Sequence, residues 1–348
     1  MTSDSSNARG AETVLRDDHL DQYRGTRVMV LGASGFIGQS VAHQLLARGA
    51  EVHLAVRDTS RARDIFRATD VHRTFVELDL LELDRLASQL KAIRPTVTFN
   101  LSGYGVDPSQ RDERAAFHIN ATVVQTVAEV LADTDRDAWP GQTLVHAGSV
   151  LEYGTIGGDL SEVSAPNPTT LYGRSKLAGT LALSRCCLDH GLNAVTARLA
   201  TVYGPGEHDG RLLPSLLDAA TSGRVLPLTE GRQQRDFTYV QDVAEGILRL
   251  AVVGTPRGHI VNLVTGRLTT VRSFACRAAQ VLGIPRDRLN FGALPRRPEE
   301  MNHEPITLAR LKRLTRWSPQ TDVVSGIRAT AMQCIEGFSE SQRARPEL

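Results

Sequence analysis

The segment Arg27-Val28-Met29-Val30-Leu31-Gly32-Ala33-Ser34-Gly35-Phe36-Ile37-Gly38 decides the fold. It predicts a short buried strand over residues 27–31, a glycine loop, and a helix from about Phe36 to Arg48. The three glycines allow a tight turn, approach of a pyrophosphate to the backbone, and close helix packing, while the helix N-terminus supplies N–H groups and positive dipole. We therefore expect Gly32, Ser34, Gly35, Phe36, Ile37 and Gly38 to bind a dinucleotide. The alternative is a plain strand–turn–helix glycine cluster.

Strand and helix patterns alternate after this segment. Strands are expected over Glu51–Val56, Thr74–Leu78, Thr96–Leu101 and Thr143–Ala147, with helices over Leu83–Ile93 and Glu113–Leu131 between them. This alternation predicts an α/β fold with a Rossmann-type, doubly wound parallel sheet.

The composition of the chain changes from Pro205 onward, where Pro and Gly become frequent and the expected helices become shorter. We expect a dinucleotide-binding domain over 25–204, to which 237–265 return, and a smaller substrate lobe over 205–236 and 266–338. Within the returning part, Phe237 to Val253 is expected to be a helix. Flexible tails are expected at 1–24 and 339–348.

The composition limits the partners and the compartment. The chain has 348 residues, 41% of them hydrophobic, and a formal net charge of +1. This balance gives no argument for a nucleic-acid or membrane-surface partner, and we find no signal peptide and no run of membrane-spanning length. The four cysteines lack metal-ligand spacing, so we predict no metal site and a reducing, cytoplasmic compartment.

The end of the second strand bears on the choice of dinucleotide. An acid there binds the adenosine 2′-hydroxyl of NAD, whereas the 2′-phosphate of NADP needs a cation. Arg57 occupies this place and favours NADP(H), while the adjacent Asp58 keeps NAD(H) as the alternative. Asp79 and Leu80 follow the third strand and are placed to contact the adenine, although Asp79 would serve equally as a helix N-cap.

Three further side chains are suited to proton transfer. Tyr172 and Lys176 are four residues apart, so a helix presents both on one face. The Lys176 ammonium is expected to lower the pKa of the Tyr172 phenol and make it an acid or base near neutrality. Ser149 ends a strand, where its hydroxyl would bind a substrate oxygen. The alternative for the Tyr-x-x-x-Lys pair is an ordinary surface pair.

The motifs together resemble the extended short-chain dehydrogenases/reductases, in the group of nucleotide-sugar epimerases, dehydratases and 4-ketoreductases. The matching segments span about residues 27–335 and are Gly32–Gly38, Asn120, Gly148–Gly154, Tyr172–Lys176, Arg198–Gly206 and Arg235–Val243.

The resemblance implies roles for individual residues. Ser149, Tyr172 and Lys176 become a catalytic triad, and Lys176 also binds the nicotinamide ribose. Asn120 becomes a structural asparagine near that lysine. Arg235 and, by a looser match, Arg297 become diphosphate-binding residues of a nucleotide-diphosphate sugar substrate; an ordinary surface charge is the alternative for each. Ser102 and Tyr104 line either the sugar pocket or the nicotinamide site. A homodimer through 113–131 and 170–190 is expected by analogy.

One departure from the family pattern helps to choose the reaction. The family's dehydratases carry an acid two residues after the catalytic Ser or Thr, and this chain has Leu151 there. Glu152 follows, but strand-like geometry would direct it elsewhere. The resemblance therefore favours NADPH-dependent reduction of the C4 ketone of a nucleotide-linked 4-keto-6-deoxyhexose. A nucleotide-sugar 4-epimerase with tightly bound NAD is the main alternative; a non-sugar reductase and a catalytically silent dinucleotide sensor remain further ones.

Overall fold

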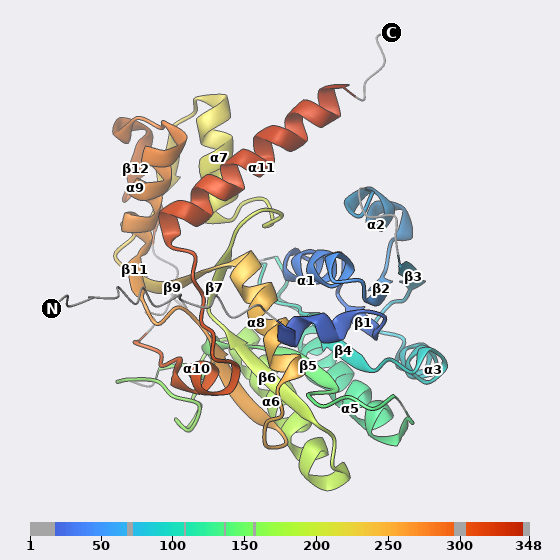
Figure 1. Ribbon diagram of the computed structural model, residues 1–348. Helices are drawn as coiled ribbons and strands as arrows, with labels where there is room; N and C mark the ends of the chain where they lie inside the picture. The colour runs from blue at the N-terminus through green and yellow to red at the C-terminus, as the bar shows by residue number, and fades with distance from the viewer. Residues whose placement is uncertain are drawn as a thin grey trace, which may run out of the picture.

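Seven parallel strands form the main sheet of the computed structural model, in the order β10-β6-β5-β4-β1-β2-β3 (Figure 1). The structure describes residues 18–67, 72–107, 109–135, 137–155, 158–295 and 304–343, with side chains between 19 and 334. The strands are β1 (Arg27–Leu31), β2 (Glu51–Val56), β3 (Arg73–Glu77), β4 (Val97–Asn100), β5 (Leu144–Ser149), β6 (Ala194–Leu199) and β10 (His259–Leu263). The strand order reverses between β1 and β4, which is where ligands bind in such sheets. The predicted Rossmann-type fold is confirmed.

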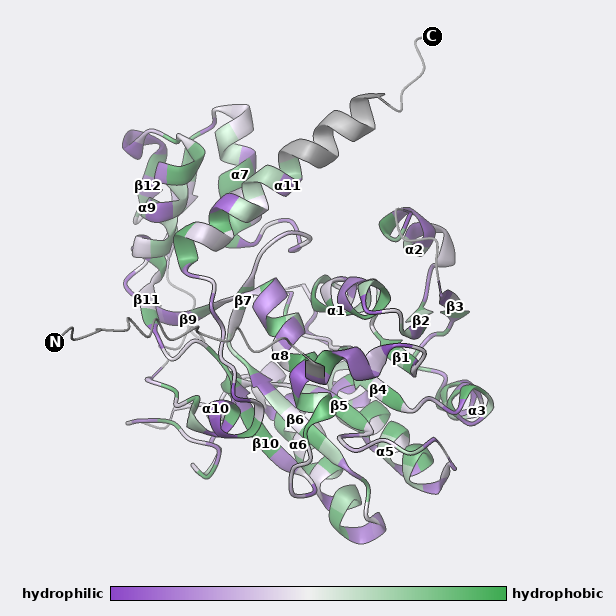
Figure 2. Cartoon of the chain, in the orientation of Figure 1, coloured by the Kyte–Doolittle hydropathy of each residue, from purple (hydrophilic) through white to green (hydrophobic). Residues whose placement is uncertain are grey.

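Helices cover both faces of the main sheet, and this is why its central strands are apolar throughout. Every residue of β4, β5 and β6 is buried. On one face pack η1 (Asp18–Tyr23), α1 (Phe36–Ala47) and α8 (Val240–Val252). On the other pack α3 (Leu83–Ile93), α5 (Val123–Asp133) and α6 (Leu171–His190). Figure 2 shows hydrophobic residues concentrated along the strands and polar residues toward the outside.

A smaller lobe is built from elements that follow β6 along the chain, and it lies above the main sheet in Figure 1. Its three-stranded sheet has the order β11-β9-β7, with β9 parallel to β7 and antiparallel to β11. Phe237 and Phe274 stack in its core at 4.2 Å between ring centroids. The remaining elements are β7 (Thr201–Tyr203), β8 (Leu226–Leu228), β9 (Gln234–Tyr239), β11 (Leu268–Thr270), β12 (Leu289–Phe291), α2 (Thr59–Ile65), α4 (Glu113–Phe117), η2 (His118–Thr122), η3 (Val150–Glu152), α7 (Leu212–Ser222), α9 (Val271–Leu282), η4 (Arg286–Arg288), α10 (Ala309–Thr315) and α11 (Val323–Arg343).

Three expectations about the chain's organisation need correction. The helix expected from Phe237 begins at Val240, because the preceding residues belong to β9. The flexible tail expected at 1–24 is wrong for residues 18–23, which form η1. This turn packs into the core through Leu20 and Tyr23, and the Tyr23 hydroxyl donates to the Leu248 carbonyl at 2.8 Å. The C-terminal tail expected from 339 is wrong as far as Arg343, where α11 ends. The domain boundaries themselves stay predictions.

No run of membrane-spanning length is expected from the sequence, and the helical segment from α4 through η2 to α5 corrects this expectation. Residues Glu113–Asp133 are long and apolar enough to cross a membrane by length and composition alone. Val123 and Val127 are fully buried and Val130 nearly so, in a core shared with α3 and α6. The segment is therefore a core helix, and these valines are buried against the rest of the same chain.

Candidate functional site

The carboxyl ends of β1, β2, β4 and β5 meet at one edge of the main sheet, because the strands are parallel. The glycine loop follows β1, Arg57 follows β2, Ser102 lies just beyond β4, and Ser149 ends β5. Residues far apart in the sequence are thus brought to the same edge, at the point where the strand order reverses. We describe this edge as the candidate site.

The glycine loop has the tight geometry that the sequence predicts. Gly32 has a φ of +75°, a conformation that favours glycine. A Cβ at Gly38 would lie 2.1 Å from the Gly32 carbonyl oxygen, so the first turn of α1 packs directly on the loop. Gly35 begins α1 with no side-chain cap. The N–H groups of this turn therefore have no capping side chain to satisfy them and are suited to bind phosphate oxygens.

The two charged residues that follow β2, Arg57 and Asp58, differ in their surroundings. Arg57 is exposed, and Asp58 caps α2 by accepting a hydrogen bond from the Arg61 N–H at 3.0 Å. Asp79 accepts from the Leu81 N–H at 3.0 Å. Glu82, not Asp79, precedes the first residue of α3. The N-cap alternative for Asp79 is therefore wrong, although its carboxylate is engaged in a local turn.

Ser149 is held by a capping box at the start of η3. Its Oγ accepts a hydrogen bond from the Leu151 N–H at 3.2 Å, and its own N–H donates to Glu152 Oε1 at 2.8 Å. The side chain is nearly buried at the end of β5. Residues 150–152 form a 3₁₀ turn, so the strand-like geometry expected for Glu152 is wrong. The Glu152 carboxylate is buried inside the fold, so it does point away from the place that a dehydratase acid would occupy.

Tyr172 and Lys176 lie in the first two turns of α6, which begins at Leu171 and is capped by Thr170. Lys176 is buried and donates to the carbonyl oxygens of Ser102 at 3.1 Å and Ala147 at 3.0 Å. Its Nζ lies 6.0 Å from the centroid of the Tyr172 ring. The structure therefore brings the ammonium to the carboxyl ends of both β4 and β5, beside the phenol.

The pKa values of this pair differ from the sequence-based expectation. Burial raises the pKa of the Tyr172 phenol well above its ordinary value, and the Glu152 carboxylate raises it further, whereas Arg211 lowers it. The expected net lowering of the Tyr172 pKa is therefore wrong for this structure. Burial lowers the pKa of Lys176 to about 8, although Glu152 acts in the opposite direction.

Asn120 connects the loop after β4 to α6. Its Nδ2 donates to the Tyr104 carbonyl at 2.8 Å and to Ser175 Oγ at 2.9 Å, and its Oδ1 accepts from the Tyr104 N–H at 3.1 Å. Asn120 is buried in the π-helical turn η2. Ser102 Oγ donates to Asn100 Oδ1 at 2.6 Å, so this hydroxyl proton is directed inward. The structure thus places Asn120 beside Ser175 and Lys176 and clamps the main chain of Tyr104.

One of the two arginines expected to bind a diphosphate, Arg235, lies outside this edge of the main sheet. Arg235 is on β9 in the smaller lobe, paired with Thr269 of β11, and its guanidinium donates to the Gln234 carbonyl at 2.9 Å. Arg297 lies outside the described residues. The roles of both arginines stay predictions.

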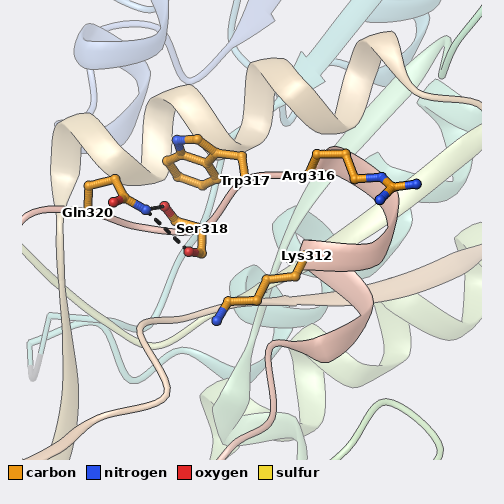
Figure 3. Close-up of a pocket in the computed structure, with 5 residues that line it drawn as sticks. All are labelled: Lys312, Arg316, Trp317, Ser318 and Gln320. Atoms are coloured by element: carbon orange, nitrogen blue, oxygen red, sulfur yellow. Dashed lines mark hydrogen bonds between the residues drawn. The ribbon is translucent and has the colours of Figure 1, made fainter. Parts of the chain in front are cut away.

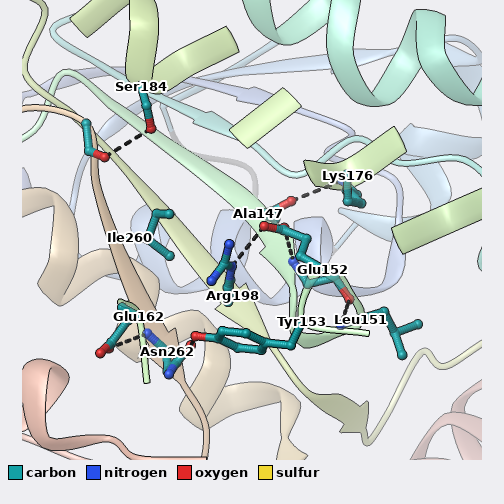
Figure 4. A network of polar contacts seen from close by, with 12 residues as sticks. Ala147, Leu151, Glu152, Tyr153, Glu162, Lys176, Ser184, Arg198, Ile260 and Asn262 are labelled. Carbon is teal, nitrogen blue, oxygen red and sulfur yellow. Dashed lines mark hydrogen bonds and ion pairs between the residues drawn. The ribbon is translucent and has the colours of Figure 1, made fainter. Parts of the chain in front are cut away.

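A buried ion pair next to Ser149 was not predicted from the sequence. Arg198 of β6 and Glu152 are paired at 2.8 Å, with side-chain exposures of 2% and 0% (Figure 4). The signal was available, since each charge interrupts an otherwise apolar buried element, and buried charges are usually paired. A second buried acid, Glu207, follows β7 and lies 3.5 Å from Arg211. Its Oε2 has no hydrogen-bond partner among the described residues.

A separate surface hollow of about 350 Å³ lies at the end of α10 (Figure 3). It is lined by Lys312, Arg316, Trp317, Ser318 and Gln320. None of the candidate catalytic residues lines it. The chemistry of the chain therefore points to the sheet edge and not to this hollow.

The residues at the sheet edge fit a dinucleotide cofactor. The uncapped first turn of α1 suits a pyrophosphate, and the missing side chain at Gly35 leaves room for its approach, whereas Gly38 lets this turn pack on the loop. Lys176 has a third N–H direction beyond its two carbonyl partners. These residues would hold a dinucleotide at the β1–β4 switch point, beside which Tyr172 and Lys176 lie.

The comparison with protein families agrees with this fold. The model of the NAD dependent epimerase/dehydratase family matches residues 28–263, and the chain belongs to this family. The resemblance to the extended short-chain dehydrogenases/reductases of the nucleotide-sugar group is therefore confirmed.

Three curated proteins illustrate the range of activities among the relatives. The chain is 28% identical over 313 residues to the UDP-glucose 4-epimerase of Mycolicibacterium smegmatis, covering 87% of this chain and 97% of that protein. It is 28% identical over 317 residues to the dTDP-6-deoxy-L-talose 4-dehydrogenase (NAD(P)(+)) of Kitasatospora kifunensis, covering 87% and 93%. It is 28% identical over 324 residues to the dTDP-4-dehydro-6-deoxy-D-allose reductase of a Streptomyces species, covering 89% and 97%.

Solved structures show the same fold. An epimerase from Methanothermobacter thermautotrophicus superposes with a TM-score of 0.83 at 22% identity, covering 94% of this chain and 97% of that one. The UDP-glucose 4-epimerase of Thermotoga maritima, solved with UDP-glucose, gives 0.79 at 20% identity, covering 89% and 99%. The Bordetella bronchiseptica enzyme WbmF, solved with NAD⁺ and UDP, gives 0.75 at 25% identity, covering 93% and 96%. The family match and the curated relatives together identify the chain as a nucleotide-sugar-modifying, NAD(P)-dependent enzyme of this family.

Proposed function

We propose that this chain reduces the C4 ketone of a nucleotide-linked 4-keto-6-deoxyhexose with NADPH. The observation that carries the proposal is the side chain two residues after Ser149. Leu151 stands where the family's dehydratases carry an acid, and the carboxylate of Glu152 is bound to Arg198 and the Ser149 N–H. The chain thus keeps the proton-transfer trio without the acid that dehydration needs. The relatives named as a 6-deoxy-talose 4-dehydrogenase and a 6-deoxy-allose reductase support the same choice.

The trio can perform the proton part of this reduction. The cofactor supplies a hydride to C4 when it is bound. The oxygen of C4 takes the phenolic proton of Tyr172, so a C=O group becomes a CH–OH group. Because Tyr172 has a raised pKa, the phenol holds its proton at neutral pH, as the reductive direction requires. Ser149 donates a hydrogen bond to the same oxygen while charge develops there, and the nearby Lys176 ammonium stabilises the phenolate that remains.

The preference for NADPH rests on the end of β2. Arg57 is exposed, and its guanidinium suits the adenosine 2′-phosphate. Asp58, which would favour NAD, is committed to capping α2. Asp79 and Leu80 are proposed to contact the adenine, and Arg235 and Arg297 the diphosphate of the sugar nucleotide.

A nucleotide-sugar 4-epimerase is the second candidate. It would use the same trio to remove the C4 hydride and return it to the other face. The relative named as a UDP-glucose 4-epimerase, at the same 28% identity, supports this alternative. The two functions differ in what happens to the cofactor, since an epimerase keeps its NAD bound and unchanged over a full cycle.

We also infer a cytoplasmic homodimer. The cysteines are free, and α6 exposes Leu181 and Leu188 on one face, at 56% and 75% exposure. Two such helices from two copies would cover this apolar face. Sedimentation velocity of the protein and of a Leu181→Glu, Leu188→Glu variant tests the dimer, which would dissociate in the variant.

Absorbance at 340 nm tests the proposed reaction. Purified protein is mixed with dTDP-4-keto-6-deoxyglucose and either NADPH or NADH. We expect loss of absorbance that is faster with NADPH and that is reduced about 10²-fold or more in Tyr172→Phe. Tyr23→Phe, which removes another buried hydroxyl outside the site, is the matched control and should keep its rate. A flat trace, together with stoichiometric NAD released on denaturation, would reject the reductase and favour the epimerase.

A further inference from the structure

The Glu152–Arg198 pair is deeply buried and lies directly behind the candidate catalytic serine. Besides its 2.8 Å contact with Glu152, the Arg198 guanidinium lies over the Tyr153 ring, 4.4 Å from its centroid. Taking two charges out of water is costly, and an apolar pair of similar volume is often as stable. Stability alone therefore gives no reason for these two charges at this place.

Glu152 acts on Ser149 through the main chain. One carboxylate oxygen accepts from the Ser149 N–H, and the other accepts from Arg198 Nε. With the turn fixed in this way, Ser149 Oγ accepts from the Leu151 N–H. One acceptor site of the hydroxyl is thus occupied, and its proton is left to be donated outward. Donation is what a substrate carbonyl or alkoxide oxygen requires.

The Glu152 carboxylate also acts electrostatically on Tyr172 and Lys176, the other two members of the trio. It raises the pKa of both Tyr172 and Lys176. Arg198 on β6, Tyr153 on the turn, and Tyr172 and Lys176 on α6 lie around this carboxylate, and His146 on β5 interacts with Lys176. Arg211 acts on Tyr172 in the opposite direction. Figure 4 shows Glu152 between Arg198 and the strand whose Ala147 carbonyl accepts from Lys176.

We propose that Glu152 is a positioning residue for the reaction: held by Arg198, it orients the Ser149 hydroxyl as a donor and sets the charge around Tyr172 and Lys176. The proposal deepens the proposed function, since it rests on the trio being catalytic, and it applies to the reductase and the epimerase alike. Arg198 neutralises the carboxylate from the far side and fixes its direction.

A matched control exists in the same polar network. Glu162 is also buried and paired with an arginine, Arg310, at 3.7 Å. It accepts from the Asn262 N–H, and Asn262 in turn accepts from the Tyr153 hydroxyl at 2.8 Å. Glu162→Gln therefore removes a buried carboxylate from this network without touching the Ser149 turn.

The chain has only three lysines, Lys91, Lys176 and Lys312, so ¹³C NMR of labelled lysine reports the titration of Lys176 directly. Lys176→Met assigns its signal. We expect a midpoint near 8 in the unmodified protein, lower by at least about half a pH unit in Glu152→Gln, and unchanged in Glu162→Gln. This measurement needs no substrate, so it stands even where the proposed reaction fails.

Kinetics and a second variant separate positioning from mere stability. With an accepted substrate, Glu152→Gln should lower kcat about tenfold or more with little change in KM. Because Glu152→Gln leaves Arg198 unpaired and destabilises the fold, Glu152→Gln/Arg198→Met is made beside it; its Tm should recover while the Lys176 midpoint and kcat stay low. An unchanged Lys176 midpoint in both variants would overturn the proposal. So would recovery of kcat together with Tm in the double variant. A flat trace with the unmodified protein rejects the proposed reaction instead.

Discussion

The Asp58 carboxylate accepts a hydrogen bond from the Arg61 N–H at 3.0 Å, and this contact begins α2. The acid nearest the end of β2 is therefore used to cap a helix. Arg57, one residue earlier, is exposed at the place that decides between the two dinucleotides.

Arg57→Ala should therefore change cofactor preference. Loss of a charge-assisted bond to a phosphate is worth about 1.5–3 kcal/mol, or about tenfold or more in affinity. We expect weaker NADPH binding by this factor and NADH binding within about twofold of the original, measured by isothermal titration calorimetry. Arg85→Ala, at an exposed arginine of α3, is the control. Equal losses for both cofactors would contradict the 2′-phosphate role.

Lys176 should set the alkaline limit of activity. Its pKa is lowered to about 8 by burial, so the ammonium charge beside Tyr172 is lost as pH rises through that value. We expect kcat/KM to fall above about pH 8. Lys176→Arg should be slower, but its decline should move beyond about pH 9.5, since the guanidinium stays charged. A decline at the same pH in both proteins would assign it to another group.

Gly35 and Gly38 should separate cofactor binding from folding. A Cβ at position 38 would lie 2.1 Å from the Gly32 oxygen, whereas one at position 35 would lie 3.2 Å from it. Gly38→Ala should lose about 3 kcal/mol of stability or fail to fold, as overpacking does. Gly35→Ala should keep a Tm within a few degrees and lose cofactor affinity about tenfold. Thermal denaturation and calorimetry check both, and a fully stable Gly38→Ala would refute the packing.

Glu207 should make stability depend on pH in an unusual direction. Burial raises its pKa to about 7 from 4.5. Between these values the folded protein keeps a proton that the unfolded chain has released, so this group's contribution to the free energy of unfolding falls as pH rises. Glu207→Gln removes the effect. Its stability relative to the unmodified protein should rise between pH 4.5 and 7.5, by up to about 3 kcal/mol.

Urea denaturation at several pH values measures this difference. Groups that titrate in both proteins cancel in the comparison. A difference for Glu207→Gln that does not change with pH would mean that folding does not raise the pKa of this carboxyl.

The sequence could predict the main sheet because each strand carries its own signal. β1 and β2 occupy the predicted residues, and α3 does too. The loop glycines are informative for the same reason, since the turn and the close packing of α1 each need glycine at one position. The place of Ser149 at the end of β5 followed from the strand pattern alone.

Elements that depend on distant partners could not be predicted in this way. Residues 236–239 are buried because β7 and β11 lie on either side, so β9 has no alternation and merges in sequence with the helix that follows. The inward direction of Glu152 depends on Arg198, which is 46 residues away in the sequence. Likewise, the raised pKa of Tyr172 depends on burial that no local spacing reveals.

The main sheet is completed only late in the chain. Its edge strand β10 pairs with β6, and α8 covers the face beside α1, yet both are encoded after the first strands of the smaller lobe. A nascent chain emerging from the ribosome therefore carries an uncovered apolar face until α8 and β10 have been synthesised. A fragment ending near residue 204 would keep that face exposed. The part of the chain before residue 204 is thus unsuited to transplantation as a module, although the candidate catalytic residues all precede that point.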